Sequence, residues 1–348
     1  MKKRIGAFTL SLLMLLSGIG IFPAEAFAAD NTVKTAVQTV EYGDRFGKPA
    51  AVTSVEWKDN LNANYTYQSN TYYGDEIVLE KQMRDALVAH QNTISFRYAT
   101  TENLVGYSYS ASEARQQFML GMINGATSET LSESTKDGDY IRWQFGGNIS
   151  AQFRLDYQKS SVNYYSIAFY GFNYYSSLAQ ESQVDAYVQN YVASINRNAM
   201  SDYALIKKIH DDVCNMTVYD EAFENRSDYY DYSAYGCMIL GRCVCQGYAL
   251  AFYRLCKEMG LQVRFVYSDP DWGCHAWNIV NLGGKFYYVD CTWDDTYSYD
   301  KVTYNFFLKN EDEIKAYDSR LGEHTLQDSI YSDSDFVNNY IQKIDTYS

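Results

Sequence analysis

The sequence has little proline, little histidine and no excess of positive charge. Three prolines among 348 residues exclude proline-rich linkers. Lysine and arginine together number 29, against 43 aspartates and glutamates, and the net charge is −14. A nucleic-acid-binding protein needs a basic face that displaces counterions, so this balance argues against nucleic acid as a partner. Histidine occurs only four times, which leaves few candidates for a catalytic base.

A long apolar run occurs once, at the N-terminus. Residues 1–4 carry three basic side chains, residues 5–22 are apolar and uncharged, and Ala26 and Ala28 offer a small-residue cleavage site. This pattern predicts a secretory signal peptide at residues 1–28, similar to bacterial export signals, with a retained membrane anchor as the alternative. We expect a mature protein that is secreted, extracellular or associated with the cell wall. We expect no membrane contact after cleavage, because no other run reaches spanning length.

The region at residues 29–200 is rich in tyrosine and shows no catalytic pattern. Apolar spacing predicts helices at residues 76–90, 110–123 and 184–195, and strands at residues 93–99, 140–145, 150–157 and 164–172. Gly146-Gly147-Asn148 predicts a hairpin between the strands at 140–145 and 150–157. We therefore expect a small α+β layer.

The composition changes after Ser201, and all seven cysteines lie at or beyond position 214. An odd number of cysteines leaves at least one thiol unpaired within a monomer. Apolar spacing predicts a helix over residues 205–213, a second helix from residue 249 to 259, and a strand over 261–267. Residues 274–280 and 285–292 then predict an antiparallel hairpin.

Three of these residues predict a catalytic triad. Cys245 lies where a loop enters the second helix, and N–H groups at a helix N-terminus lower the pKa of a thiol. With Leu282-Gly283 as the hairpin turn, His275 lies directly opposite Asp290; with Gly283-Gly284 as the turn, the two are diagonal neighbours. Both registers place the two side chains on one face, within reach of each other. The sequence thus predicts Cys245 as nucleophile, His275 as base and Asp290 as the carboxylate that orients it.

The same residues resemble the transglutaminase-like superfamily, a papain-like group that includes transglutaminases, cysteine peptidases and peptide N-glycanases. The resemblance covers roughly residues 201–310. It is carried, in order, by Cys245-Gln246-Gly247-Tyr248-Ala249, His275-Ala276-Trp277-Asn278 and Tyr288-Val289-Asp290-Cys291-Thr292-Trp293-Asp294. It implies an α+β fold in which the nucleophile helix packs on an antiparallel sheet, forming a catalytic domain at residues 201–330. It implies the same three catalytic roles. We expect no cofactor.

Residues near the triad have alternative roles. Asp294 and Asp295 are rival orienting carboxylates, although they follow Trp293 and are expected to face a loop. His210 lies on a helix beside two aspartates and is expected to be structural, and His324, outside the core, receives no role. No metal site is predicted, because the cysteines lack paired Cys-x-x-Cys spacing.

Two further expectations concern the surroundings of the triad. Cys274 and Cys291 point to the opposite face of the hairpin, either as a disulfide bridge or as two free thiols. Asp269, Asp271, Asp294 and Asp295 are expected to make the rim of the cleft negative, or else to form an ordinary solvated surface. Trp277 and Trp293 are either packed core residues or walls of a substrate groove.

These residues predict a cysteine enzyme that attacks an amide carbonyl and forms a thioester acyl-enzyme. Water then gives hydrolysis, and an amine gives a new isopeptide bond, so the motif is compatible with a peptidase and with a transglutaminase. The expected substrates are extracellular proteins or wall peptides, and the sequence leaves the oligomeric state open. The alternative is a non-catalytic secreted module on the same fold that binds a surface or wall polymer.

Overall fold

The computed structural model describes residues 34–41, 61, 63–225, 227–268, 274–295, 302–317, 324 and 338–347. The predicted signal peptide at residues 1–28 lies outside them. Helices and several sheets build the described parts, which confirms the predicted mixed α+β fold class. Within these ranges, no helix combines the length and apolar character needed to cross a membrane.

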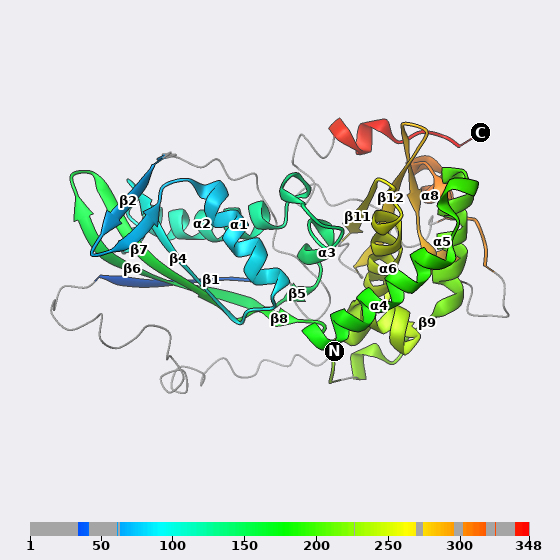
Figure 1. Cartoon of the computed structure of the whole chain (residues 1–348), viewed down its shortest axis with the longest axis horizontal. Coiled ribbons are helices and arrows are strands. Elements are labelled where there is room, and N and C mark those ends of the chain that lie inside the picture. The colour runs from blue at the N-terminus through cyan, green and yellow to red at the C-terminus, as the bar shows by residue number, and fades with distance from the viewer. Residues whose placement is uncertain are drawn as a thin grey trace, which may run out of the picture. The chain divides into compact units, whose positions relative to one another are not determined.

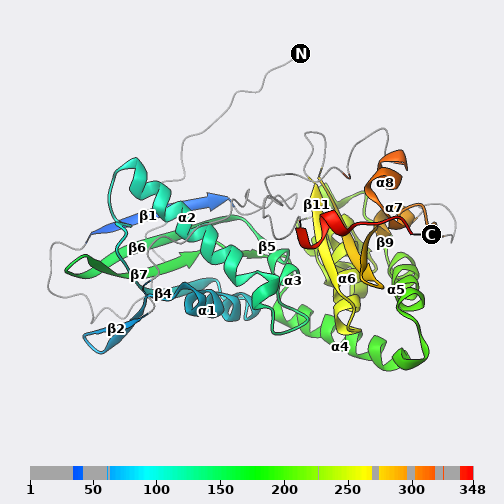
Figure 2. The same cartoon turned by 90° about the horizontal axis from the view of Figure 1, so that it is seen from above.

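The N-terminal part is built on a six-stranded sheet with strand order β1-β6-β7-β4-β3-β2. The strands are β1 (Thr35–Glu41), β2 (Asn64–Tyr67), β3 (Asn70–Tyr73), β4 (Thr93–Thr100), β6 (Asn148–Lys159) and β7 (Val162–Tyr170). Alternation along β4 turns Ile94, Phe96 and Tyr98 to one face, where all three are buried. Helices α1 (Glu76–Val88) and α2 (Tyr109–Ala126) pack on that face (Figures 1 and 2).

The hairpin predicted around Gly147 does not form, and of residues 140–145 only Phe145 lies in a strand. Residues 139–142 form the short helix α3 (Asp139–Arg142), and β5 (Phe145–Gly146) pairs with β8 (Asn173–Tyr174) instead of with β6. Gly138 has a φ of +63°, which turns the chain into α3. The Asp139 side chain then binds Arg264 and the backbone N–H of Phe265, a tertiary contact that overrides the local strand pattern.

The C-terminal part is built on a four-stranded sheet with order β11-β12-β13-β14. Its strands are β11 (Val263–Ser268), β12 (His275–Leu282), β13 (Lys285–Val289) and β14 (Phe307–Lys309). Helix α6 (Cys245–Glu258) packs on β11 and β12 and against α5 (Asp202–Met216) (Figure 1). Because α6 has neighbours on several sides, its residues from Gln246 to Cys256 are all buried.

Shorter elements connect these layers. The remaining helices are α4 (Leu178–Ser194), α7 (Cys291–Asp294) and α8 (Glu311–Tyr317), and β9 (Val218–Tyr219) pairs in parallel with β10 (Arg242–Cys243). Single helical turns are η2 (Glu129–Leu131), η3 (Arg197–Ala199), η4 (Phe223–Asn225), η5 (Tyr230–Tyr232), η6 (Gly236–Leu240) and η7 (Ile341–Lys343). Among them η6 is a π-helical turn, and the others are 3-10 turns.

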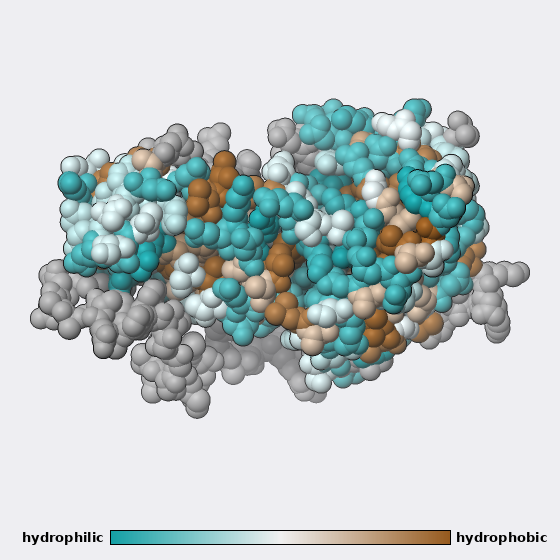
Figure 3. Space-filling view, viewed as in Figure 1, coloured by the Kyte–Doolittle hydropathy of each residue, from teal (hydrophilic) through white to brown (hydrophobic). Residues whose placement is uncertain are grey.

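The six-stranded sheet and the four-stranded sheet each have a hydrophobic core of their own. The core around the four-stranded sheet also takes in Trp143, Val184 and Val188, which precede the predicted domain boundary at residue 200. That boundary stays a prediction. On the face seen in Figure 3, hydrophilic residues predominate and apolar residues form small patches.

Candidate active site

Cys245 is the first residue of α6, as the sequence predicts, and its side chain is partly buried. The backbone N–H groups of Ala276 and Gln246 hydrogen-bond its sulfur. The sulfur therefore lies beside the start of β12, one residue from His275. Burial and the neighbouring Cys274 raise the pKa of the Cys245 thiol well above its usual range, and the two N–H groups offset this only in part. The sequence-based expectation of a lowered pKa is wrong, because burial outweighs the helix terminus.

The chain around Cys245 is held tightly. Gln246 is buried and donates from Nε2 to the carbonyl oxygens of Trp143, at 2.7 Å, and Tyr232, at 3.0 Å. Gly247 has no room for a side chain, since a Cβ atom there would lie 2.5 Å from Cys243 Cβ and 2.8 Å from the Asp231 carbonyl oxygen. These two residues of the Cys-Gln-Gly sequence therefore fix the backbone that presents the thiol.

His275 and Asp290 are hydrogen-bonded across the hairpin. His275 Nε2 donates to Asp290 Oδ2 at 2.6 Å, and both side chains are buried. Asn278 pairs with Val289, so the hairpin adopts the register with Gly283-Gly284 as its turn. Because Nε2 makes this bond, Nδ1 is the ring nitrogen left for proton exchange with the thiol. The Cys245 sulfur accepts from the backbone N–H of Ala276, the residue after His275, while the catalytic roles stay predictions.

Asp290 is held at both carboxylate oxygens. Its Oδ1 accepts from the backbone N–H groups of Thr292, at 2.8 Å, and Trp293, at 3.3 Å, and so caps the N-terminus of α7. Burial acts to raise its pKa, but the two imidazoles that bond Oδ2 outweigh this and lower the pKa well below its usual range. Asp290 is therefore ionised at neutral pH.

The second of these imidazoles belongs to His324, for which the sequence predicts no role. His324 Nε2 lies 2.8 Å from Asp290 Oδ2, the oxygen that also binds His275. The His324 side chain is buried and its ring stacks on Phe306. It lies 34 residues beyond Asp290, outside the pattern of the hairpin. The one signal in the sequence is that histidine is scarce in this chain.

Aromatic rings surround the two histidines. Trp277 stacks on His275 with ring centroids 5.8 Å apart and is fully buried, so it is a packed core residue. Trp293 meets His275 edge to face at 6.1 Å and is only partly buried, so it remains a candidate wall for a substrate. This apolar surrounding strengthens the charged hydrogen bonds on Asp290 by excluding water.

Asp294 and Asp295, the alternative carboxylates for orienting His275, bind other side chains. Asp294 is fully buried and accepts from His210 Nε2 at 3.1 Å, and Asp295 accepts from the Tyr248 hydroxyl at 2.5 Å. Neither orients His275. The expected acidic rim is wrong for Asp294, whose side chain is taken up by contacts inside the protein. Asp269 and Asp271 lie outside the described residues.

Of the two alternatives for Cys274 and Cys291, the disulfide bridge does not form. The Cys291 thiol hydrogen-bonds Cys214, whereas Cys274 lies beside Cys245, and none of the seven cysteines forms a disulfide. Within the described ranges, two groups of side chains place three ligand atoms close enough for a metal ion: His275 with Asp290 and His324, and His210 with Cys214 and Cys291. The first group is already joined by the hydrogen bonds described above.

The chain is similar to known proteins over part of its length. Residues 189–291, which contain all three triad positions, match the family model of the Transglutaminase-like superfamily. The chain is similar to the kyphoscoliosis peptidases of Homo sapiens and Mus musculus, with 26% identity over 193 residues in both cases. Each match covers 51% of this chain and 29% of the relative, so the chain spans less than a third of their length. Among solved structures, the crystal structure of a TGase matches 49% of both chains at 15% identity, with a TM-score of 0.30.

Proposed function

We propose that the protein is an exported cysteine enzyme that acts on amide bonds through a thioester acyl-enzyme. The observation that carries this proposal is the position of the Cys245 sulfur, which accepts the N–H of Ala276 next to a His275 ring fixed by Asp290. A nucleophile, a base and an orienting carboxylate in this order are what amide acyl transfer requires.

The raised pKa of Cys245 implies a neutral thiol in the resting enzyme. In the proposed mechanism, His275 Nδ1 takes the thiol proton as the sulfur attacks the amide carbonyl. The backbone N–H of Cys245 donates to the oxyanion that forms. His275 then returns the proton to the leaving amine, the C–N bond breaks, and the acyl group stays on sulfur as a thioester.

The fate of the thioester decides the reaction. Water regenerates the thiol and releases a carboxylic acid, whereas an amine regenerates it and forms a new amide. The similarity to peptidases supports hydrolysis, and the match to a transglutaminase-like family supports transfer. The predicted signal peptide supports extracellular proteins or wall peptides as substrates.

The test is mass spectrometry of a peptide library incubated with the protein, with and without an added primary amine. Hydrolysis appears as cleaved or deamidated peptides, and transfer appears as amine adducts. We expect at least one of these products with the wild-type chain and none with the Cys245→Ala variant. An unchanged library in both conditions would overturn the proposal and favour a non-catalytic module that binds a surface polymer.

A further inference from the structure

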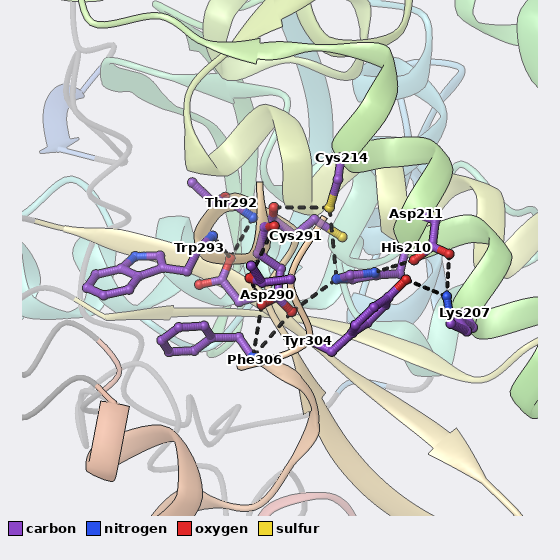
Figure 4. Close-up of polar contacts among 12 residues, drawn as sticks. Lys207, His210, Asp211, Cys214, Asp290, Cys291, Thr292, Trp293, Tyr304 and Phe306 are labelled. Carbon is purple, nitrogen blue, oxygen red and sulfur yellow. Dashed lines mark hydrogen bonds and ion pairs between the residues drawn. The ribbon is translucent and has the colours of Figure 1, made fainter. Parts of the chain in front are cut away.

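A second cluster of reactive side chains lies between α5 and α7 and has no part in the proposed reaction. His210 and Cys214 lie four residues apart on α5, and Cys291 and Asp294 lie three residues apart on α7. Both spacings place the two side chains on one face of their helix, and the two faces meet. Figure 4 shows His210, Cys214 and Cys291 turned toward one another.

The cluster is closed off from solvent. His210 and Asp294 are completely buried, and Cys214 and Cys291 are each 3% exposed. His210 Nε2 lies 3.1 Å from Asp294 Oδ2 and 3.9 Å from Cys214 Sγ. One ligand atom from each of His210, Cys214 and Cys291 falls within 4.8 Å of the others.

Two thiols, an imidazole and a carboxylate are the ligand types that zinc prefers, and a structural zinc site has four of them in a tetrahedron. With zinc–nitrogen bonds of about 2.0 Å and zinc–sulfur bonds of about 2.3 Å, neighbouring ligand atoms lie about 3.3–3.8 Å apart. The two distances from His210 Nε2 bracket that range. We propose that His210, Cys214, Cys291 and Asp294 bind one structural Zn²⁺ ion.

The surrounding residues support the same assignment. A histidine that binds a metal through one ring nitrogen usually donates from the other to a carboxylate, and His210 Nδ1 lies 3.1 Å from Asp211 Oδ1. Lys207 in turn binds Asp211 at 2.5 Å. A ligating carboxylate is itself hydrogen-bonded, and Asp294 Oδ1 accepts from the Thr303 hydroxyl at 2.8 Å.

This site was missed in the sequence because its spacing is unusual. The ligands come as His-x-x-x-Cys on one helix and Cys-x-x-Asp on another, so no Cys-x-x-Cys pair marks them. Binding would release the thiol protons and any proton on the imidazole to solvent, since zinc binds thiolate and neutral imidazole. The bound ion would join α5 to α7, the helix that Asp290 caps, and so fix the position of that carboxylate.

The first test is the metal content of the full chain, expressed in zinc-containing medium and purified with a reductant and without a chelator. We expect about one zinc ion per chain, released by a strong chelator together with a fall in melting temperature. Cobalt exchanged into the site should show the thiolate charge-transfer bands and intense visible bands of a tetrahedral site with sulfur ligands. Mass spectrometry should show that zinc protects Cys214 and Cys291 from alkylation.

Variants locate the ion. Cys214→Ser and Cys291→Ser should each lose the zinc and the cobalt charge-transfer bands, while Cys256→Ser, a buried cysteine on α6 outside the cluster, should keep both. The wild-type measurements stand even where a variant does not fold. A chain that stays without zinc after reconstitution would overturn the proposal. So would zinc retained in both cluster variants, or cobalt spectra without thiolate bands.

Discussion

His324 and His275 share one oxygen atom of Asp290. Their Nε2 atoms lie 2.8 and 2.6 Å from Oδ2, while Oδ1 of the same carboxylate caps α7. An orienting carboxylate with two imidazole donors and two backbone donors has little freedom to rotate. We therefore predict that His324 is a positioning residue that acts on His275 through Asp290.

Replacing His324 with Phe tests this role, because a phenyl ring can keep the stacking on Phe306 but cannot donate to Asp290. A hydrogen bond to a charged group is worth about 1.5–3 kcal/mol, so we expect kcat to fall about 10- to 100-fold with little change in KM. The measurement is steady-state kinetics across a pH series, with the melting temperature as the check on folding.

The His324→Gln variant is the matched control, because its amide restores a donor. Partial recovery of kcat and of the wild-type pH profile is expected in that variant. Full kcat in His324→Phe would show that Asp290 needs no second imidazole.

Replacing Cys245 with Ala should abolish product formation and leave the free energy of unfolding within about 1 kcal/mol of the wild-type value, since the side chain is only partly buried. Cys243→Ser is the matched control two residues earlier. Cys243 is fully buried and its sulfur lies 3.5 Å from the Thr217 hydroxyl, whereas Cys245 is partly exposed, so we expect Cys243→Ser to keep turnover. Turnover by Cys245→Ala together with its loss in Cys243→Ser would reverse this assignment.

The contact between His275 and Asp290 could be predicted because both candidate turns place the two side chains on the same face of the hairpin. Leu282-Gly283 and Gly283-Gly284 give different registers, yet both put the two residues on one face. The position of Cys245 at the start of α6 followed in the same way from a loop signal before a helical run. Local periodicity is sufficient to predict the position of a residue whose partners lie on adjacent elements.

Long-range contacts explain why some of the predictions from the sequence are wrong. Residues 140–145 have the alternation of a strand, but Asp139 is bound by Arg264, which lies 125 residues away. Asp294 has the sequence context of a loop residue, but His210 binds it in the interior. His324 reaches Asp290 across a stretch that no periodic pattern connects to the hairpin. Such contacts depend on how separate elements meet, which spacing within one element does not record.

The ion pair between Asp139 and Arg264 ties α3 to β11 and should be important for stability. Arg264 Nε lies 2.7 Å from Asp139 Oδ2, and both side chains are largely buried. Removing one partner of a buried pair leaves an uncompensated charge and costs about 3–5 kcal/mol. We expect a loss of that size in the Asp139→Asn variant, measured by urea unfolding. Asp202→Asn, which breaks the exposed pair with Arg197, should cost less than about 1 kcal/mol.

Acid should weaken the same contact. Burial acts to raise the pKa of Asp139, but the charge and hydrogen bonds of Arg264 outweigh it and lower the pKa below its usual value. A carboxylate with a lowered folded-state pKa contributes stability above its unfolded pKa of about 3.9 and loses it as the pH falls further. The stability difference between wild type and Asp139→Asn should therefore be constant near neutral pH and shrink below about pH 4. A difference that does not change down to the acid transition would contradict this origin.

The pH dependence of Cys245 alkylation distinguishes a neutral resting thiol from a preformed thiolate. Burial and Cys274 raise the pKa of Cys245, so little thiolate is present at neutral pH. We expect iodoacetamide to react with Cys245 more slowly than with free cysteine near pH 7, where a free thiol of pKa about 8.5 is already a few per cent ionised. The alkylation rate should still rise with pH above about pH 9, because the thiolate fraction of a thiol with a raised pKa keeps increasing there. Subtracting the Cys245→Ala signal in peptide mapping isolates this residue from Cys274. Rapid alkylation of Cys245 near pH 6 would instead require a thiolate–imidazolium pair with His275, and His275 would then act first as the acid that protonates the leaving amine.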